Sequence, residues 1–108
     1  MTVDIGLKAT VEVTTWVTKL VGGSDLAAQT EQVMRNVGLA LAAAGADFSH
    51  VVKITTYVVN YKPEHRAIIG KARAPFFKNA PPASTLVGVS ALALPEWLVE
   101  IEAIAVVD

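Results

Sequence analysis

Residues 98–107 read LVEIEAIAVV, a run rich in β-forming residues whose character changes at alternate positions. Successive side chains of a strand point to opposite faces of a sheet, so this run divides into two faces. One face would carry Val99, Ile101, Ala103 and Ala105, and the other Leu98, Glu100, Glu102 and Ile104. A strand this apolar is expected inside a sheet, with its two carboxylates about 7 Å apart on one face.

The glutamate pair on this strand has two interpretations. The face that holds Glu100 and Glu102 could meet solvent or pair with lysines across the sheet. Alternatively, it could line a cleft, where a carboxylate acts as a general base or orients a water molecule. The alternation by itself leaves both interpretations open.

Two further strands are predicted upstream. Residues 8–18 (KATVEVTTWVT) are rich in Val, Thr and Trp, but their alternation slips near Thr14 and Thr15, which predicts a bulge or a short hairpin. Residues 51–59 (VVKITTYVV) alternate more regularly. One face of this second strand would carry Val52, Ile54, Thr56 and Val58, and the other Lys53, Thr55 and Tyr57.

The first predicted helix follows the glycine pair at 22–23. Ser24 or Asp25 can cap its amino end, and the helix is expected to run to about Ala44. Gly45 supplies the left-handed stop. The apolar residues recur at helical spacing and form one stripe, which consists of Leu26, Val33, Val37, Leu41 and Ala44.

A second helix and two last strands complete the chain. Pro63 stands where a first helical turn tolerates proline, and Pro75 is expected to kink or end the helix near Ala74. Strands follow at about 84–91 and 97–107. This order of elements predicts a single α+β domain over residues 1–108, with two helices layered on one face of a mixed sheet.

The composition limits the possible functions. Hydrophobic residues make up 53% of the 108 residues, so apolar surface beyond the core is expected, which favours an oligomer. A net charge of −1 gives no electrostatic basis for binding nucleic acid or an anionic membrane. Without cysteine the chain has no disulfide, thiolate nucleophile or thiolate metal site. The start MTVDIGLKATVEV lacks a signal-peptide pattern, and no apolar run reaches membrane-spanning length, so a cytoplasmic protein is expected.

Two segments resemble one known family. Residues 27–58 (AAQTEQVMRNVGLALAAAGADFSHVVKITTYV) and 82–107 (PASTLVGVSALALPEWLVEIEAIAVV) are similar to the RidA/YjgF family, also called the endoribonuclease L-PSP or translation-inhibitor family. The ending VEIEAIA is the most specific part of the match. The resemblance implies a chorismate-mutase-like α+β fold, a homotrimer and ligand clefts between neighbouring subunits. It also implies hydrolysis of reactive enamines and imines to keto acids and ammonia, with no cofactor.

The resemblance assigns roles position by position. In the family, a glutamate on the last strand orients the attacking water, and the matching residue is Glu100. An arginine early in the penultimate strand holds the substrate carboxylate with a bidentate contact, and the matching residue is Ser84. The helix asparagine that lines the family cleft matches Gly70, and Leu86 would offer its backbone carbonyl and amide. One polar side chain of the family site is therefore kept and several are replaced.

Another cation could supply the missing positive charge. The candidates are Arg73 on the second helix, Lys53 on the preceding strand, and Arg66. Alternatively, Ser84 and Thr85 could donate neutral hydrogen bonds, each contributing about 1 kcal/mol against about twice that for a charged donor. A site of this second kind would bind a common keto-acid imine weakly and would suit a larger or less anionic ligand.

Other positions add little to the predicted site. Trp16 and Thr18 stand where the family has a tyrosine and an SGQ strand ending, so the N-terminal part of the cleft departs from the pattern. His50 and His65 have no carboxylate at ligand spacing, so a metal site is not expected.

Three functions follow from these observations. The first is a deaminase with a changed substrate, which uses Glu100 and a water molecule. The second is a non-catalytic trimer that binds a small metabolite in the same clefts. The third is the ribonuclease or translation-inhibitor role in the family name, against which the slightly acidic chain argues because it has no basic stripe.

Overall fold

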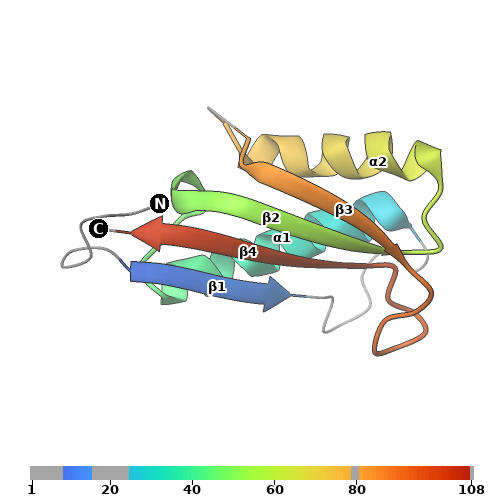
Figure 1. Cartoon of the computed structure of the whole chain (residues 1–108), viewed down its shortest axis with the longest axis horizontal. Coiled ribbons are helices and arrows are strands. Elements are labelled where there is room, and N and C mark those ends of the chain that lie inside the picture. The colour runs from blue at the N-terminus through green and yellow to red at the C-terminus, as the bar shows by residue number, and fades with distance from the viewer. Residues whose placement is uncertain (1–8, 16–24, 79–80, 108) are drawn as a thin grey trace.

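A computed structural model of the chain describes residues 9–15, 25–78 and 81–107. Within these ranges, four strands form one mixed sheet in the order β1-β4-β2-β3 (Figure 1). Their bounds are β1 Ala9–Thr15, β2 Val51–Val59, β3 Ala83–Val89 and β4 Val99–Val107. The strand β4 runs antiparallel to both β1 and β2, while β3 lies parallel to β2 at the edge. The position of β4 inside the sheet confirms the expectation drawn from its apolar sequence.

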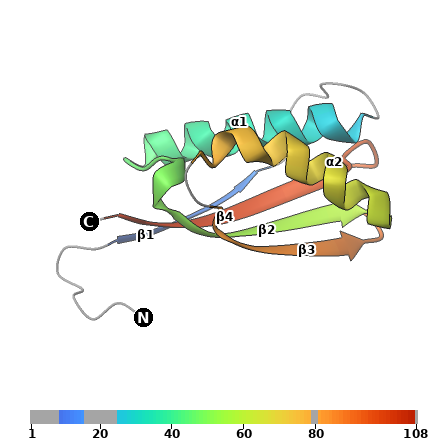
Figure 2. The ribbon, with the colours of Figure 1, turned by 90° about the horizontal axis from the view of Figure 1, so that it is seen from above.

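Both α-helices cover the same face of this sheet. The helices α1 (Leu26–Ala43) and α2 (Pro63–Arg73) lie side by side above it, and the other face has no covering element from the described residues (Figure 2). Two short 3-10 turns accompany them, η1 (Phe48–His50) and η2 (Ala74–Phe76). The predicted α+β architecture, with two helices on one face of a mixed sheet, is confirmed.

The ends of α1 follow the predicted signals. Asp25 caps the amino end, where its carboxylate accepts hydrogen bonds from the backbone amides of Ala27 (2.9 Å) and Ala28 (3.3 Å). At the other end Gly45 adopts a φ of +80°, a left-handed conformation that glycine reaches without steric cost.

The core lies between the helices and the sheet. From α1 the buried apolar residues are Val33, Met34, Val37 and Leu41. The predicted stripe is therefore confirmed at its centre, whereas Leu26 is only half-buried and the prediction for Ala44 is wrong, because Ala44 lies past the end of α1 and is exposed. From β4 the buried apolar residues are Val99, Ile101, Ala103 and Ala105, as the alternation predicted. Burial of this apolar surface is the main favourable contribution to folding, at about 25 cal/mol per Å².

The strand β2 carries an irregularity that the sequence analysis placed elsewhere. The register of β2 against β4 shifts between Val51 and Lys53, so Val51 is buried and Val52 is 50% exposed. The prediction that Val52 shares the buried face of Ile54 is therefore wrong, because the extra residue of a bulge reverses the alternation before it. In contrast, β1 pairs with β4 without a shift through Thr15, so the bulge predicted near Thr14 is absent from the described part of β1.

The second helix ends close to the predicted point. The α-helical hydrogen bonds of α2 stop at Arg73, and η2 continues for one tighter turn that contains Pro75. The strands β3 and β4 are shorter than predicted, since residues 90–98 form the loop between them. No described helix is both long enough and apolar enough to cross a membrane.

Candidate ligand-binding site

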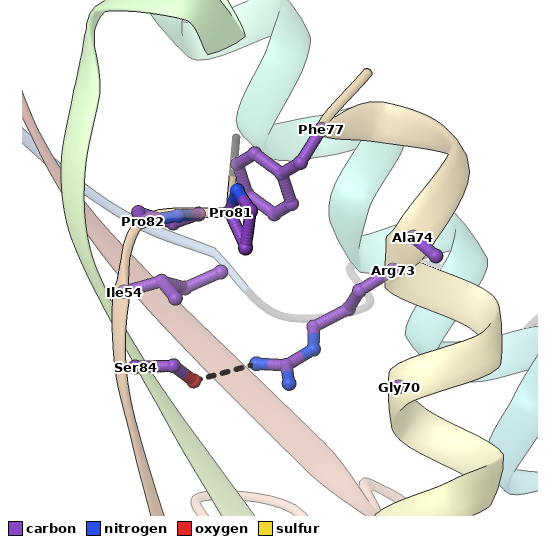
Figure 3. Close-up of a pocket in the computed structure, with 8 residues that line it drawn as sticks. All are labelled: Ile54, Gly70, Arg73, Ala74, Phe77, Pro81, Pro82 and Ser84. Atoms are coloured by element: carbon purple, nitrogen blue, oxygen red, sulfur yellow. Dashed lines mark hydrogen bonds between the residues drawn. The ribbon is translucent and has the colours of Figure 1, made fainter. Parts of the chain in front are cut away.

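A pocket of about 300 Å³ lies at the corner where α2 faces β2 and β3 (Figure 3). Residues from both strands, from the last turns of α2 and from the segment before β3 line it. They include Ile54, Gly70, Arg73, Phe77, Pro82 and Ser84. Two positions singled out by the family resemblance, Gly70 and Ser84, therefore line one pocket.

Arg73 extends its side chain from the last turn of α2 toward the strands (Figure 3). Its Nη1 donates hydrogen bonds to the hydroxyl oxygens of Thr56 (3.1 Å) and Ser84 (3.2 Å). The guanidinium therefore reaches the strand position at which the family resemblance led us to expect an arginine. The cation at this position therefore comes from α2 and not from β3.

The surroundings of Arg73 stabilise its charge poorly. Both hydrogen-bond partners are neutral hydroxyls, and Nε is buried without a hydrogen-bond partner in the described part of the chain. Removal of the group from water lowers the pKa of Arg73 below its ordinary value. A buried guanidinium without a counter-ion costs free energy, and an anion in the pocket would offset that cost.

The strand register explains which β3 side chains reach this pocket. Ser84 pairs with the buried Ile54, whereas Thr85 pairs with Thr55, which lies on the opposite face. Neighbouring strands present paired residues on the same face, so Ser84 and Leu86 lie on the helix-covered face and Thr85 on the open one. The predicted group of Ser84, Thr85 and Leu86 is thus divided between two faces of the sheet.

Glu100 lies on the open face of the sheet. It alternates with the buried residues Val99 and Ile101 of β4, and its pairing partner in β2 is Tyr57. Glu102 shares this face and accepts a hydrogen bond from the phenolic hydroxyl of Tyr57 at 2.8 Å. That hydrogen bond, reinforced by burial and by the nearby carboxylates, raises the pKa of Tyr57.

The sheet itself separates the two halves of the predicted site. Arg73 and Ser84 lie on the helix-covered face, and Glu100 lies on the open face. Because β-strands fill the space between these faces, the three residues cannot contact one ligand within a single chain. A site that contains all of them needs the open face of a second copy.

The other candidate residues do not approach the pocket. Lys53 is exposed on the open face, where it pairs with Ile104, and Arg66 is exposed on α2. His50 and His65 each accept a hydrogen bond at Nδ1 from a backbone amide at the start of a helical turn. Among the described residues, no three His, Asp or Glu side chains are grouped to hold a metal ion.

Sequence reasoning missed the walls of the pocket. Thr56, which accepts a hydrogen bond from Arg73, was predicted only to share a strand face with Ile54. Phe77, whose ring lines the pocket, was not singled out. The position of Arg73 was a usable signal in the sequence. It lies just before Pro75, which ends the helix, so its side chain projects from the end of α2 near the start of the next strand. Trp16 and Thr18, predicted near the cleft, lie outside the described residues.

Comparison with known proteins identifies the fold and the family. The profile of the family described as Endoribonuclease L-PSP matches residues 9–107. Protein DfrA of Myxococcus xanthus is 44% identical over 82 residues, which cover 76% of this chain and 60% of that protein. Reactive Intermediate Deaminase A, chloroplastic, of Arabidopsis thaliana is 39% identical over 77 residues, which cover 71% of this chain and 40% of that protein. The chain therefore spans less than two thirds of the length of these relatives.

Solved structures agree with this result. The Rid-family protein YyfB of Yersinia pestis superimposes with a TM-score of 0.82 at 43% identity, covering 94% of this chain and 80% of that one. Rv2704 of Mycobacterium tuberculosis, a member of the YjgF/YER057c/UK114 family, gives a TM-score of 0.78 at 36% identity, covering 96% and 82%. The chain belongs to the Endoribonuclease L-PSP family, which is the RidA/YjgF family that its sequence resembles.

Proposed function

We propose that this protein forms small-molecule clefts between the subunits of a homotrimer and hydrolyses an enamine or imine there, with an altered substrate preference. The observation that carries the proposal is the 3.2 Å hydrogen bond from Arg73 Nη1 to Ser84 Oγ. This hydrogen bond supports the proposal because it brings a guanidinium to Ser84, the residue that the family resemblance matches to the substrate-binding arginine. The name of the Arabidopsis relative, Reactive Intermediate Deaminase A, supports the same reaction class.

The reaction asks little of the protein. An enamine first takes a proton at carbon and gives up a proton at nitrogen, which makes it an imine with an electrophilic carbon. Water adds to that carbon as a new C–O bond forms, and the C=N electron pair moves to nitrogen. One proton passes from the added water to the nitrogen, which gives a carbinolamine. The remaining hydroxyl proton then moves to the nitrogen, the C=O bond forms as the C–N bond breaks, and ammonia leaves a keto acid. The protein needs to hold the carboxylate, orient the water and move the proton.

The available groups divide these tasks between two subunits. Arg73, assisted by the Ser84 hydroxyl, would hold the carboxylate from the helix-covered face of one subunit. Glu100 would orient the water and move the proton from the open face of the neighbouring subunit. Leu86 would offer its backbone groups from the same strand as Ser84. Gly70 lines the pocket without a side chain and leaves room for the substrate.

A non-catalytic binding protein is the alternative. It would use the same Arg73 pocket but release its ligand unchanged, and ligand-dependent melting without turnover would identify it. A ribonuclease is supported less, because the net charge of −1 offers no basic surface for an RNA backbone.

The Glu100→Gln variant tests the catalytic proposal. Loss of a general base lowers the rate of ammonia release from an imine by about 100-fold or more. Ammonia is measured with a coupled dehydrogenase while an amino-acid oxidase generates a range of imines in the reaction mixture. Glu102→Gln is the matched control, since Glu102 lies on the same face and a glutamine oxygen can still accept from Tyr57. No acceleration by the unmodified protein with any imine would contradict the proposal.

A further inference from the structure

The walls of the Arg73 pocket are mostly apolar. Ile54 forms the floor from β2 and is 1% exposed, and Pro81 and Pro82 border the pocket before β3. Phe77 completes the wall beyond α2, and its ring is held by an edge-on contact with Phe48 at a centroid distance of 5.5 Å. Apart from Arg73 and the Ser84 hydroxyl, the described lining side chains offer no polar group (Figure 3).

The pocket is larger than a small acid requires. Its volume of about 300 Å³ lies at the lower end of the range for sites that bind drug-sized ligands, about 300–1,000 Å³. Gly70 contributes to this space, because a Cβ built there would meet nothing within 4 Å. In Figure 3 Gly70 lies on α2 beside the guanidinium, so the open volume adjoins the positive charge.

The positive charge and the apolar walls select different parts of one ligand. Among the described residues the guanidinium has only neutral hydrogen-bond partners and its Nε has none, so it favours an anion. The apolar walls favour a substituent that gains free energy by leaving water. A small polar acid would satisfy the charge and leave the remaining volume to water.

We propose that this pocket binds carboxylic acids that carry a bulky apolar group, namely 2-oxo or 2-imino acids with a branched aliphatic or aromatic side chain. Arg73 is the anion anchor, and Ile54, Phe77 and Pro82 contact the apolar group. The imino form rests on the proposed function, whereas binding of the acid rests on the pocket alone.

Binding of stable 2-oxo acids to the full chain tests the proposal. Calorimetric titration with phenylpyruvate is expected to give a Kd at least about tenfold lower than titration with pyruvate, because only the aromatic acid fills the pocket. 3-Phenylpropionate is expected to bind and its neutral amide to bind at least about tenfold more weakly, since the amide cannot pair with the guanidinium.

Two variants locate the site. Gly70→Leu fills the open volume while favouring the helix, so it is expected to weaken phenylpyruvate binding by a larger factor than pyruvate binding. Arg73→Met is expected to abolish the response to both acids without lowering the melting temperature of the free protein, because it removes a buried charge whose hydrogen-bond partners in the described part of the chain are neutral.

Each contrary outcome overturns a defined part of the proposal. Equal affinity for phenylpyruvate and pyruvate overturns the apolar preference, and equal affinity for the acid and its amide overturns the anion anchor. Unchanged binding by Gly70→Leu overturns the location. Selective binding without turnover of the matching imine would contradict the deaminase activity but support the proposed ligand class. Turnover of imines without selective binding would support the deaminase activity but contradict the proposed ligand class.

Discussion

At position 84 a serine hydroxyl receives a hydrogen bond from a guanidinium of another element, Arg73 of α2. The positive charge in this pocket is therefore supplied by the helix α2. An arginine fork is suited to a carboxylate from either direction, so moving its Cα changes the approach of the ligand and the space around it. This exchange is the residue-scale reason to expect an altered substrate preference.

Tyr57 gives a residue-scale prediction about pH. Its hydrogen bond to Glu102 raises its pKa in the folded protein, so the folded state holds the phenolic proton more tightly than the unfolded chain does. The resulting stabilisation is complete below the unfolded pKa of about 10 and is lost as the pH rises through the folded pKa. Above that pH, the free energy of unfolding of Tyr57→Phe is expected to fall less steeply than that of the unmodified protein.

Urea unfolding of the unmodified protein and Tyr57→Phe across the alkaline range measures this difference. The Tyr61→Phe variant is a control, because it removes a phenol on the connection to α2. Parallel stability profiles for the unmodified protein and Tyr57→Phe would contradict the assigned role of the Tyr57–Glu102 hydrogen bond.

Local signals at the ends of elements positioned the helices. Asp25 and Gly45 at the ends of α1 act as predicted, and Pro75 ends the regular part of α2 close to the predicted residue. The β2 bulge was not predicted, because Val51 and Val52 have the same apolar character and the sequence cannot tell which one faces the core. Pairing with β4 decides between them.

The cap of α1 gives an element-scale prediction. Asp25→Ala removes the acceptor for the amides of Ala27 and Ala28 and is expected to lower the free energy of unfolding by about 1 kcal/mol. Chemical denaturation measures the change. Asp25→Asn keeps a capping oxygen and is expected to lose much less, so equal losses in both variants would show that the hydrogen bonds are not the cause.

At the scale of the whole molecule, one face of the sheet is left uncovered by the described elements. It presents Glu100, Glu102 and Tyr57 together with apolar residues of β4, and no described element covers it (Figure 2). The proposed trimer would bury this face and bring Glu100 to the Arg73 pocket of a neighbour. Assembly and catalysis are then coupled, because neither face alone holds both groups.

Mixed assemblies test this arrangement. Arg73→Met and Glu100→Gln are each expected to be inactive, but subunits of the two variants assembled together would form some sites with both groups intact. Random mixing in a ring of three is expected to restore about a quarter of the unmodified activity. Co-expression with two affinity tags yields the mixed species, and native mass spectrometry verifies their composition. Mixed trimers that stay inactive would contradict a shared site.

The elements, their order, the two faces of β4 and the family could all be predicted from the sequence, because alternation, helical spacing and caps are local properties of the chain. The serine at position 84 also showed that the arginine of the family is missing from this strand. Among Arg73, Lys53 and Arg66, the one that reaches Ser84 could be identified only from the three-dimensional structure, since contact depends on the distance between α2 and β3. Likewise, the placement of Glu100 and Ser84 on opposite faces follows from the strand register, because a shift of one residue would exchange the faces.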